Sequence, residues 1–211
     1  MQGEIVVREA TARDWEVRAE LVRRSITDYD LDAFLLFFFQ ELTLQVCVLC
    51  GAVMFIFMGA GLAACACVVP VAAAAVALAV LLWHRALADS HAQRLRAELR
   101  GFVAEHRGRV VGTASVAERW GPRRGGWLHG LAVAAAWRRR GAGAALLGAV
   151  RAYAAAEGLE LLEARATELQ GAARCLLHDA GWEIRGSYAR PLLGAALELH
   201  VTQLALELPH A

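Results

Sequence analysis

The strongest constraint in this sequence is an uncharged apolar block in its first half. The 43 consecutive residues Leu42–His84 contain no Asp, Glu, Lys or Arg. One transmembrane helix needs about 20 residues to cross the apolar core of a bilayer, so this block is long enough for two. The natural dividing point is the turn Gly59-Ala60-Gly61. We therefore expect a helical hairpin with spans at Leu42–Met58 and Leu62–Trp83, and a lipid bilayer as its partner.

Two features of the block leave alternatives open. The first span is short, and Phe34–Phe39 would extend it if Gln40 and Glu41 lie at the interface or pack inside the protein. Pro70 lies in the second span, where a membrane helix tolerates it with a kink. A re-entrant loop that never reaches the far side of the membrane is the alternative to a hairpin.

Four of the five cysteines also lie in this block, as the pairs Cys47-x-x-Cys50 and Cys65-x-Cys67. Such spacings occur in zinc and redox sites, but neither a His nor a carboxylate neighbours them here. Free cysteine is commonly a small apolar residue, so we expect no metal site. Cys175 is the only cysteine in the polar part, and no disulfide framework is expected.

The composition argues against two broad classes of protein. The sequence holds 22 basic and 21 acidic residues, and 58% of its residues are hydrophobic. So large a hydrophobic fraction is not typical of a disordered chain. The near-zero net charge gives no reason to expect a nucleic-acid partner.

The segments on both sides of the block alternate strands and helices. A strand at Glu4–Glu9 and a helix from Thr11 to about Ser25 precede the block. After it, an amphipathic helix at Ala86–Arg100 is expected near the membrane surface or on the core. The remaining elements are strands at Phe102–Glu105, Arg109–Val116, Gly126–Val133, Leu159–Thr167, Trp182–Arg190 and Leu197–Leu206, and helices at Ala144–Glu157 and Glu168–Asp179. This order predicts one α/β domain with a partly parallel sheet covered by helices.

A basic glycine turn, Arg138-Arg139-Arg140-Gly141-Ala142-Gly143, joins one of these strands to the next helix. Backbone N–H groups at a helix N-terminus form an anion site suited to phosphate or pyrophosphate, and the two glycines permit close approach of a ligand. No Gly-Lys-Ser/Thr follows, and Leu146 replaces the last glycine of a dinucleotide fingerprint. A solvated basic edge without a ligand is the alternative interpretation.

The pattern Arg138-x-x-Gly141-x-Gly143, after the strand LHGLAV and before an amphipathic helix, resembles the acetyl-CoA signature of the GNAT superfamily of N-acetyltransferases. Phe102–Gly112 resembles the central hairpin of that family, and Leu176–Trp182 resembles its late helix. An apolar insertion before the hairpin is similar to the camello-like, membrane-bound branch, which acts on cysteine S-conjugates, aspartate or protein lysines. The resemblance covers nearly all of the chain outside the block.

This resemblance implies a GNAT-like α/β fold, with a mixed, partly parallel sheet flanked by helices and an inserted transmembrane hairpin. It implies acetyl-CoA as co-substrate. In the family, backbone N–H groups of the strand before the turn hold the thioester arm, and the turn holds the pyrophosphate. Carried over, these roles fall on Leu131, Ala132 and Val133 for the arm, and on Arg138, Arg139, Arg140, Gly141, Ala142, Gly143 and Ala144 for the phosphates.

The departing thiolate of an acetyl transfer needs a proton. Family members commonly donate it from a late-helix Tyr, but Leu177 occupies that position here. Either Tyr188 or Cys175 serves instead, or the thiolate leaves without that group, or the protein binds the cofactor without efficient turnover.

The acceptor amine must also lose a proton, and His129 is the best-placed base. It lies on the strand beside the expected thioester site, and His titrates near neutral pH. A His on the sheet face away from the cofactor is the alternative. Glu118 and Glu163 are weaker candidates, because each is expected to be a surface carboxylate.

We predict three segments: the first strand and helix of the catalytic domain at 1–33, the membrane insert at 34–85 and the rest of the domain at 86–211. Both flanks contribute to one sheet, so they lie on the same side of the membrane. Arginines such as Arg85 flank the block while the Gly59 turn is uncharged, and the positive-inside rule places the domain in the cytosol. The resemblance points to the endoplasmic reticulum.

The expected function is a membrane-anchored N-acetyltransferase that moves the acetyl group of acetyl-CoA to an amine of a small molecule or a protein. The small molecule would be an amino acid or a cysteine S-conjugate. The alternative is a catalytically weak or inactive relative that acts as a membrane-bound CoA-binding or interaction protein.

Overall fold

A seven-stranded sheet in the order β1-β2-β3-β4-β5-β7-β6 organises the chain. The computed structural model describes residues 5–119, 121, 123–193 and 197–208. The strands are β1 (Val6–Glu9), β2 (Arg100–His106), β3 (Arg109–Arg119), β4 (Gly125–Val133), β5 (Leu161–Thr167), β6 (Glu183–Leu193) and β7 (Leu197–Glu207). Only β4 and β5 pair in parallel, and the other neighbours are antiparallel. The predicted mixed sheet is confirmed.

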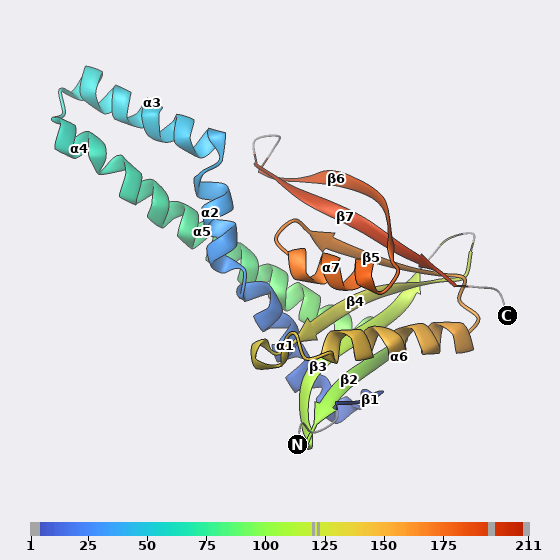
Figure 1. Ribbon diagram of the computed structural model, residues 1–211. Helices are drawn as coiled ribbons and strands as arrows, with labels where there is room; N and C mark the ends of the chain where they lie inside the picture. Colours follow the sequence, from blue (N-terminus) through green and yellow to red (C-terminus); the bar gives the residue numbers. More distant parts are fainter. Residues whose placement is uncertain (1–4, 120, 122, 194–196, 209–211) are drawn as a thin grey trace.

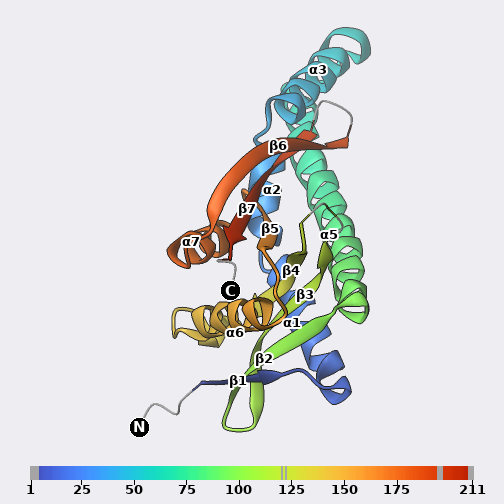
Figure 2. The same ribbon diagram turned by 90° about the vertical axis from the view of Figure 1, so that its right-hand side faces the viewer.

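Helices cover both faces of this sheet. On one side lie α6 (Ala142–Ala156) and α7 (Gly171–Asp179), and on the other lie α1 (Trp15–Thr27) and the C-terminal part of α5 (Val68–Arg94) (Figure 1 and Figure 2). We call these the α6 face and the α1 face. The apolar stripe of α6 explains its position, because it is buried in the main core. Its buried residues are Ala142, Leu146, Leu147, Val150 and Ala154.

Most predicted elements lie within a few residues of the observed ones, although Glu4 lies outside the described residues. The helical stretch predicted at Ala86–Arg100 is helical as far as Arg94 and packs on the core, but it is not a separate helix and its predicted end is wrong. Instead, α5 continues without interruption to Arg94, a 3-10 turn (η2, Leu95–Ala97) follows, and β2 begins at Arg100. The reason is packing, since Ala88 and Ala92 are buried and continue the helical period, with Ala92 packed against α1.

The apolar block forms a helical hairpin that projects from the sheet domain (Figure 1). Its arms are α3 (Glu41–Met58), followed by α4 (Leu62–Ala66) and α5. At the predicted turn, Gly59 ends α3 in the left-handed conformation, with a φ of 61°. The helices α3 and Leu62–Arg94 are each long and apolar enough to cross a membrane, and the most apolar 18-residue stretch of each is almost entirely exposed.

Two breaks interrupt the helices of this block. Phe34–Phe38 belongs to a separate helix, α2 (Asp30–Phe38), which packs on α5, and Gln40 is extended. These residues therefore do not extend α3. The second break, at Cys67, separates α4 from α5 three residues before Pro70. Proline has no N–H for the carbonyl of residue i−4, which explains the predicted irregularity.

On the α1 face, a buried arginine joins three parts of the chain. The guanidinium of Arg18 donates to both carboxylate oxygens of Glu98 at 2.7 and 2.5 Å, to Thr113 Oγ1 at 3.0 Å and to Ser115 Oγ at 2.8 Å. Arg18 is only 3% exposed. These bonds connect α1 to the segment before β2 and to β3, beneath the middle of the sheet.

We expect Arg18→Met to lower the free energy of unfolding by about 3 kcal/mol, because it leaves a mostly buried carboxylate and two buried hydroxyls without their donor. Denaturant unfolding of the detergent-solubilised protein measures this. Arg23→Met is the control, since the Arg23–Asp89 pair is solvent-exposed and exposed pairs contribute under about 1 kcal/mol. Equal losses in the two variants would contradict the prediction.

Candidate functional site

The central feature of the site is a split between β4 and β5. The two strands pair only at Gly125–Trp127 and Leu161–Glu163, although β4 continues to Val133 and β5 to Thr167. In the described part of the chain, the edge of β4 beyond Trp127 has no ladder partner on the β5 side. Backbone polar groups need partners, so this edge is available to water or to a ligand.

A β-bulge lies beside the split. Thr113 pairs with Ala132 and Ser115 with His129, so Ala114 faces two residues of β4, Gly130 and Leu131. Gly130 has a φ of 61°, and a Cβ there would lie 2.7 Å from Leu95 Cδ2. Both constraints select glycine. Our sequence reasoning missed the bulge, and a glycine inside a strand pattern was the available signal.

The extra residue of the bulge decides which face each β4 side chain occupies. Leu128, Leu131 and Val133 pack against the core on the α6 face. Ala132 packs against α1 and α5 on the opposite face. Trp127 and His129 alternate with Leu128, so they point to the α1 face. The strand therefore presents its apolar side chains to α6 and a titratable group to the other side.

The Arg-Gly turn lies at the end of β4, after a 3-10 turn (η3, Ala135–Trp137). Arg139 and Gly141 have φ values of 61° and 85°, which bring the chain into α6. The N–H of Ala145 bonds to the carbonyl of Gly141 at 2.9 Å, so the N–H groups of residues 142–144 have no partner within the helix. Together with the helix dipole, these N–H groups favour an anion at this position, which is where the sequence predicts an anion site.

The glycines and arginines of this turn have different surroundings. A Cβ on Gly141 would meet open space, whereas one on Gly143 would lie 2.7 Å from Leu176 Cδ2. Gly143 therefore allows Leu176 of α7 to pack closely on α6, and a larger residue there would require this side chain to shift. Arg138 donates to the carbonyl of Val133 at 3.2 Å and pairs with Asp28 at the end of α1. Its side chain holds the turn in place, while Arg139 and Arg140 are exposed.

His129 is mostly buried, and its Nε2 atom has no hydrogen-bond partner among the described residues. Burial lowers the pKa of His129 to about 4, which the charge of Glu98 partly offsets; the charges of His91, Arg18 and Arg94 lower it further. The imidazole is therefore neutral at physiological pH, but it is a weaker base than the histidine titrating near neutral pH that was expected from the sequence.

The other candidate acids and bases fall in different environments. Leu177 is 2% exposed in the core beneath α6, and its carbonyl accepts a hydrogen bond from Trp182 N–H at 3.0 Å. Tyr188 lies on β6, is 40% exposed and points to the α1 face beside Arg165. Cys175 is exposed on α7.

Of the two carboxylates considered as bases, Glu163 is paired with Arg119 at 2.7 Å. Glu118 is exposed. Neither is arranged as a base near the split. In the described part of the chain, no group of three or more His, Cys, Asp or Glu side chains could hold a metal ion.

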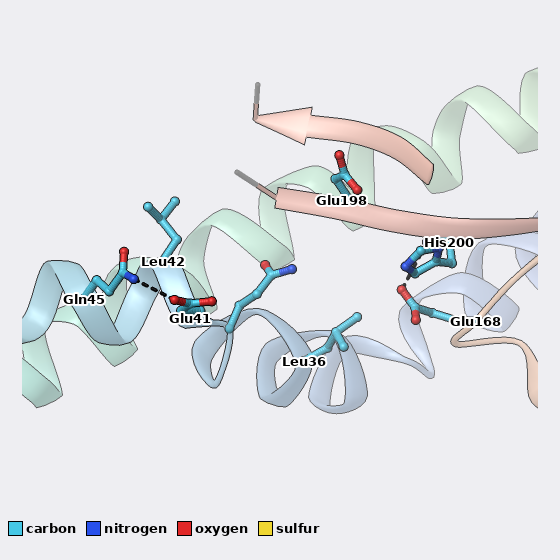
Figure 3. A pocket seen from close by; sticks show the side chains of 8 residues that line it. Leu36, Glu41, Leu42, Gln45, Glu168, Glu198 and His200 are labelled. Carbon is cyan, nitrogen blue, oxygen red and sulfur yellow. Dashed lines mark hydrogen bonds between the residues drawn. The ribbon is translucent and has the colours of Figure 1, made fainter. Parts of the chain in front are cut away.

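A cavity of about 590 Å³ lies elsewhere, at the base of the hairpin (Figure 3). Two of its three carboxylates have local partners: Glu41 accepts from Gln45 at 2.8 Å, and Glu168 from the backbone N–H of His200 at 3.1 Å. The lining residues are Leu36, Gln40, Glu41, Leu42, Gln45, Glu168, Glu198 and His200. None of them belongs to β4 or to the Arg-Gly turn, so we assign the candidate site to the split.

Comparison with solved structures shows the same fold in known proteins. The ribosomal-protein-alanine N-acetyltransferase of Brucella melitensis is 19% identical, with 96% of this chain and 99% of that chain covered and a TM-score of 0.56. The yncA structure from Salmonella typhimurium, determined with its cofactor acetyl-CoA, is 16% identical, with 99% and 96% covered and a TM-score of 0.57. An N-acetyltransferase from Staphylococcus aureus Mu50 gives 16% identity, 97% and 98% coverage and a TM-score of 0.56.

None of the curated proteins compared with the chain matches it. A family model does: residues 75–182 match the acetyltransferase (GNAT) family. This range runs from the middle of α5 to the end of α7 and includes the split, the bulge and the Arg-Gly turn. It covers just over half of the chain. The chain therefore belongs to the acetyltransferase (GNAT) family.

Proposed function

We propose that this acetyltransferase is anchored in a membrane and transfers the acetyl group of acetyl-CoA to the amine of a small molecule, an amino acid or cysteine S-conjugate, or of a protein. The observation that carries the proposal is the split between β4 and β5, which joins open strand backbone to the anion site at α6. The membrane-bound camello-like branch is the part of the family that we propose for it.

The residues of the site fit acetyl-CoA. The N–H groups at the start of α6 and the exposed Arg139 and Arg140 suit a pyrophosphate, and Gly141 leaves open space beside them. Leu131, Ala132 and Val133 offer the strand edge to the amide-rich pantetheine arm, in line with yncA, whose structure holds acetyl-CoA. Arg138 supports the turn through Val133 and Asp28.

The same residues define the chemistry that we propose. Backbone N–H groups beside the bulge polarise the thioester carbonyl. Neutral His129 takes the proton of the acceptor amine from the α1 face. Leu177 cannot donate a proton to the leaving thiolate, so Tyr188 is our candidate acid on that face, with Cys175 on α7 or unassisted departure as the alternatives.

For the anchor, we propose that α3 and the N-terminal part of α5 cross the bilayer as a hairpin. Their apolar side chains are exposed over almost their whole length, which suits lipid. Because α1 precedes the insert, β2 follows it and both belong to one domain, the two ends of the insert must lie on the same side of the membrane. The insert must therefore cross the bilayer an even number of times. Arg23, Arg24 and Arg85 flank the insert and the Gly59 turn is uncharged, which supports a cytosolic domain on the endoplasmic reticulum.

A second candidate, a catalytically weak relative that binds CoA or a protein partner, is favoured by one observation. Leu177 lies in the apolar core, where a proton donor is expected from the resemblance. Acetylated product from a broad amine panel would count against this candidate.

We expect Gly141→Glu to weaken CoA binding by at least about tenfold. The substitution places a carboxylate at the anion site and forces a side chain into a backbone conformation with a φ of 85°, and both effects oppose a bound pyrophosphate. Isothermal titration measures the Kd. Gly148→Glu is the matched control, because Gly148 is exposed on the same helix with open space around it. If the wild type binds no CoA, the proposed function is wrong.

We expect His129→Gln to lower kcat by about 10² or more, the usual contribution of a general base. The variant should also change the pH dependence of stability. The folded pKa of about 4 lies below the unfolded value of about 6.5, so wild type loses stability as pH falls from about 6.5 to 4. The variant should lose less over this range in denaturant unfolding. An unchanged kcat would remove His129 from the mechanism.

The proposed topology predicts that a protease added outside sealed microsomes degrades the domain while a luminal control protein is protected. A cysteine-reactive, membrane-impermeant reagent should likewise label Cys175, which is exposed on α7, without detergent. Protection of the domain equal to that of the luminal control would contradict a cytosolic location.

A further inference from the structure

Arg165 occupies an unusual place in the sheet. It lies on β5, between β4 and β7, two residues after Glu163, the last residue of β5 that pairs with β4. Continuing that register would place Arg165 opposite His129, across the split. Its side chain is exposed on the α1 face, the face to which His129 points. A charged residue in a central strand at the mouth of an active site needs an explanation.

Two aromatic rings hold the guanidinium of Arg165. Its Cζ lies 4.5 Å from the ring centroid of Trp127 on β4 and 6.0 Å from that of Tyr188 on β6. Both distances are within the range of cation–π attraction. Such contacts use the face of the guanidinium and leave its in-plane N–H donors for other partners. The two aromatic rings therefore orient the guanidinium of Arg165 without accepting hydrogen bonds from its N–H groups.

A nearby arginine on the same face shows the contrast. The guanidinium of Arg119 is paired with the carboxylate of Glu163 at 2.7 Å. Arg165 makes no ion pair or side-chain hydrogen bond with any other described residue. On this face, carboxylates therefore neutralise Arg18 and Arg119, whereas the donors of Arg165, beside the split, remain open.

We propose that Arg165 binds an anionic group of the acceptor, so that the preferred acceptors are amines with a carboxylate or a phosphate a few bonds from the nitrogen. This inference rests on the proposed acetyl transfer. A planar guanidinium recognises both anions through paired hydrogen bonds. With the anion on Arg165, the amine would point across the split toward His129 and the thioester. Arg165 is then a specificity residue that orients the acceptor.

The test uses two matched pairs of acceptors: phenylalanine with 2-phenylethylamine, and O-phosphoethanolamine with ethanolamine. In wild type we expect kcat/KM to be at least about tenfold higher for an anionic member than for its neutral partner. The pair with the larger ratio identifies carboxylate or phosphate as the preferred anion. Arg165→Gln should raise KM for that anionic acceptor about tenfold or more, with little change in kcat and little change for the neutral partner.

Three further variants separate specificity from structure. Arg165→Lys keeps the charge but not the paired donors. Its KM for the anionic acceptor should therefore lie between the KM of wild type and that of Arg165→Gln. Tyr188→Phe keeps the ring beside Arg165 and should retain the preference for anionic acceptors, even if loss of the hydroxyl lowers kcat. Arg151→Gln is the control, because Arg151 is exposed on α6. It should leave kcat/KM unchanged for all four acceptors.

The outcomes separate this inference from the proposed function. Equal kcat/KM for anionic and neutral acceptors in wild type overturns the inference. It is also overturned if Arg165→Gln raises KM equally for the anionic and the neutral acceptor. Wild type that binds CoA by titration but acetylates neither anionic acceptor also overturns it. Failure of wild type to bind CoA overturns the proposed function itself.

Discussion

The structure depends on one constraint: a sheet whose central strands separate must still satisfy their backbone polar groups. Gly130 introduces a bulge into β4, and pairing with β5 ends at Trp127. The open strand edge runs toward the Arg-Gly turn, where the first N–H groups of α6 are also without helical partners. The site thus combines an open strand edge with the unpaired N–H groups at the start of α6, and a cofactor rich in amides and phosphates needs partners of both kinds.

On the α1 face, the charged and titratable side chains near the split differ in whether the protein already provides them with partners. Arg18 neutralises the charge of Glu98 and donates to the hydroxyls of Thr113 and Ser115 on β3. Burial lowers the pKa of His129, so its imidazole is neutral. The exposed cation of Arg165 beside the split lies against two aromatic rings. The charge of Glu98 is thus neutralised, while Nε2 of His129 has no partner among the described residues.

Periodicity and turn residues were sufficient to predict the order of elements, the hairpin turn at Gly59 and the glycine turn that begins α6, because these features depend on neighbours in sequence. The bulge was not predicted, since it is defined by a mismatch between two strands. The Arg138–Asp28 pair joins residues 110 positions apart, and the stack of Trp127, Arg165 and Tyr188 joins three strands. Such contacts depend on tertiary structure, as does the continuation of α5 beyond the apolar block.

The uninterrupted α5 has a mechanical consequence. Its 27 residues extend about 40 Å as a helix, with one end in the exposed apolar hairpin and the other packed on α1 against the sheet. In the proposed anchor, a rigid helix would take the place of a flexible tether between the domain and the membrane. In a bilayer, the tilt of this helix would set the height and orientation of the split, so substrates would meet the domain from a fixed direction.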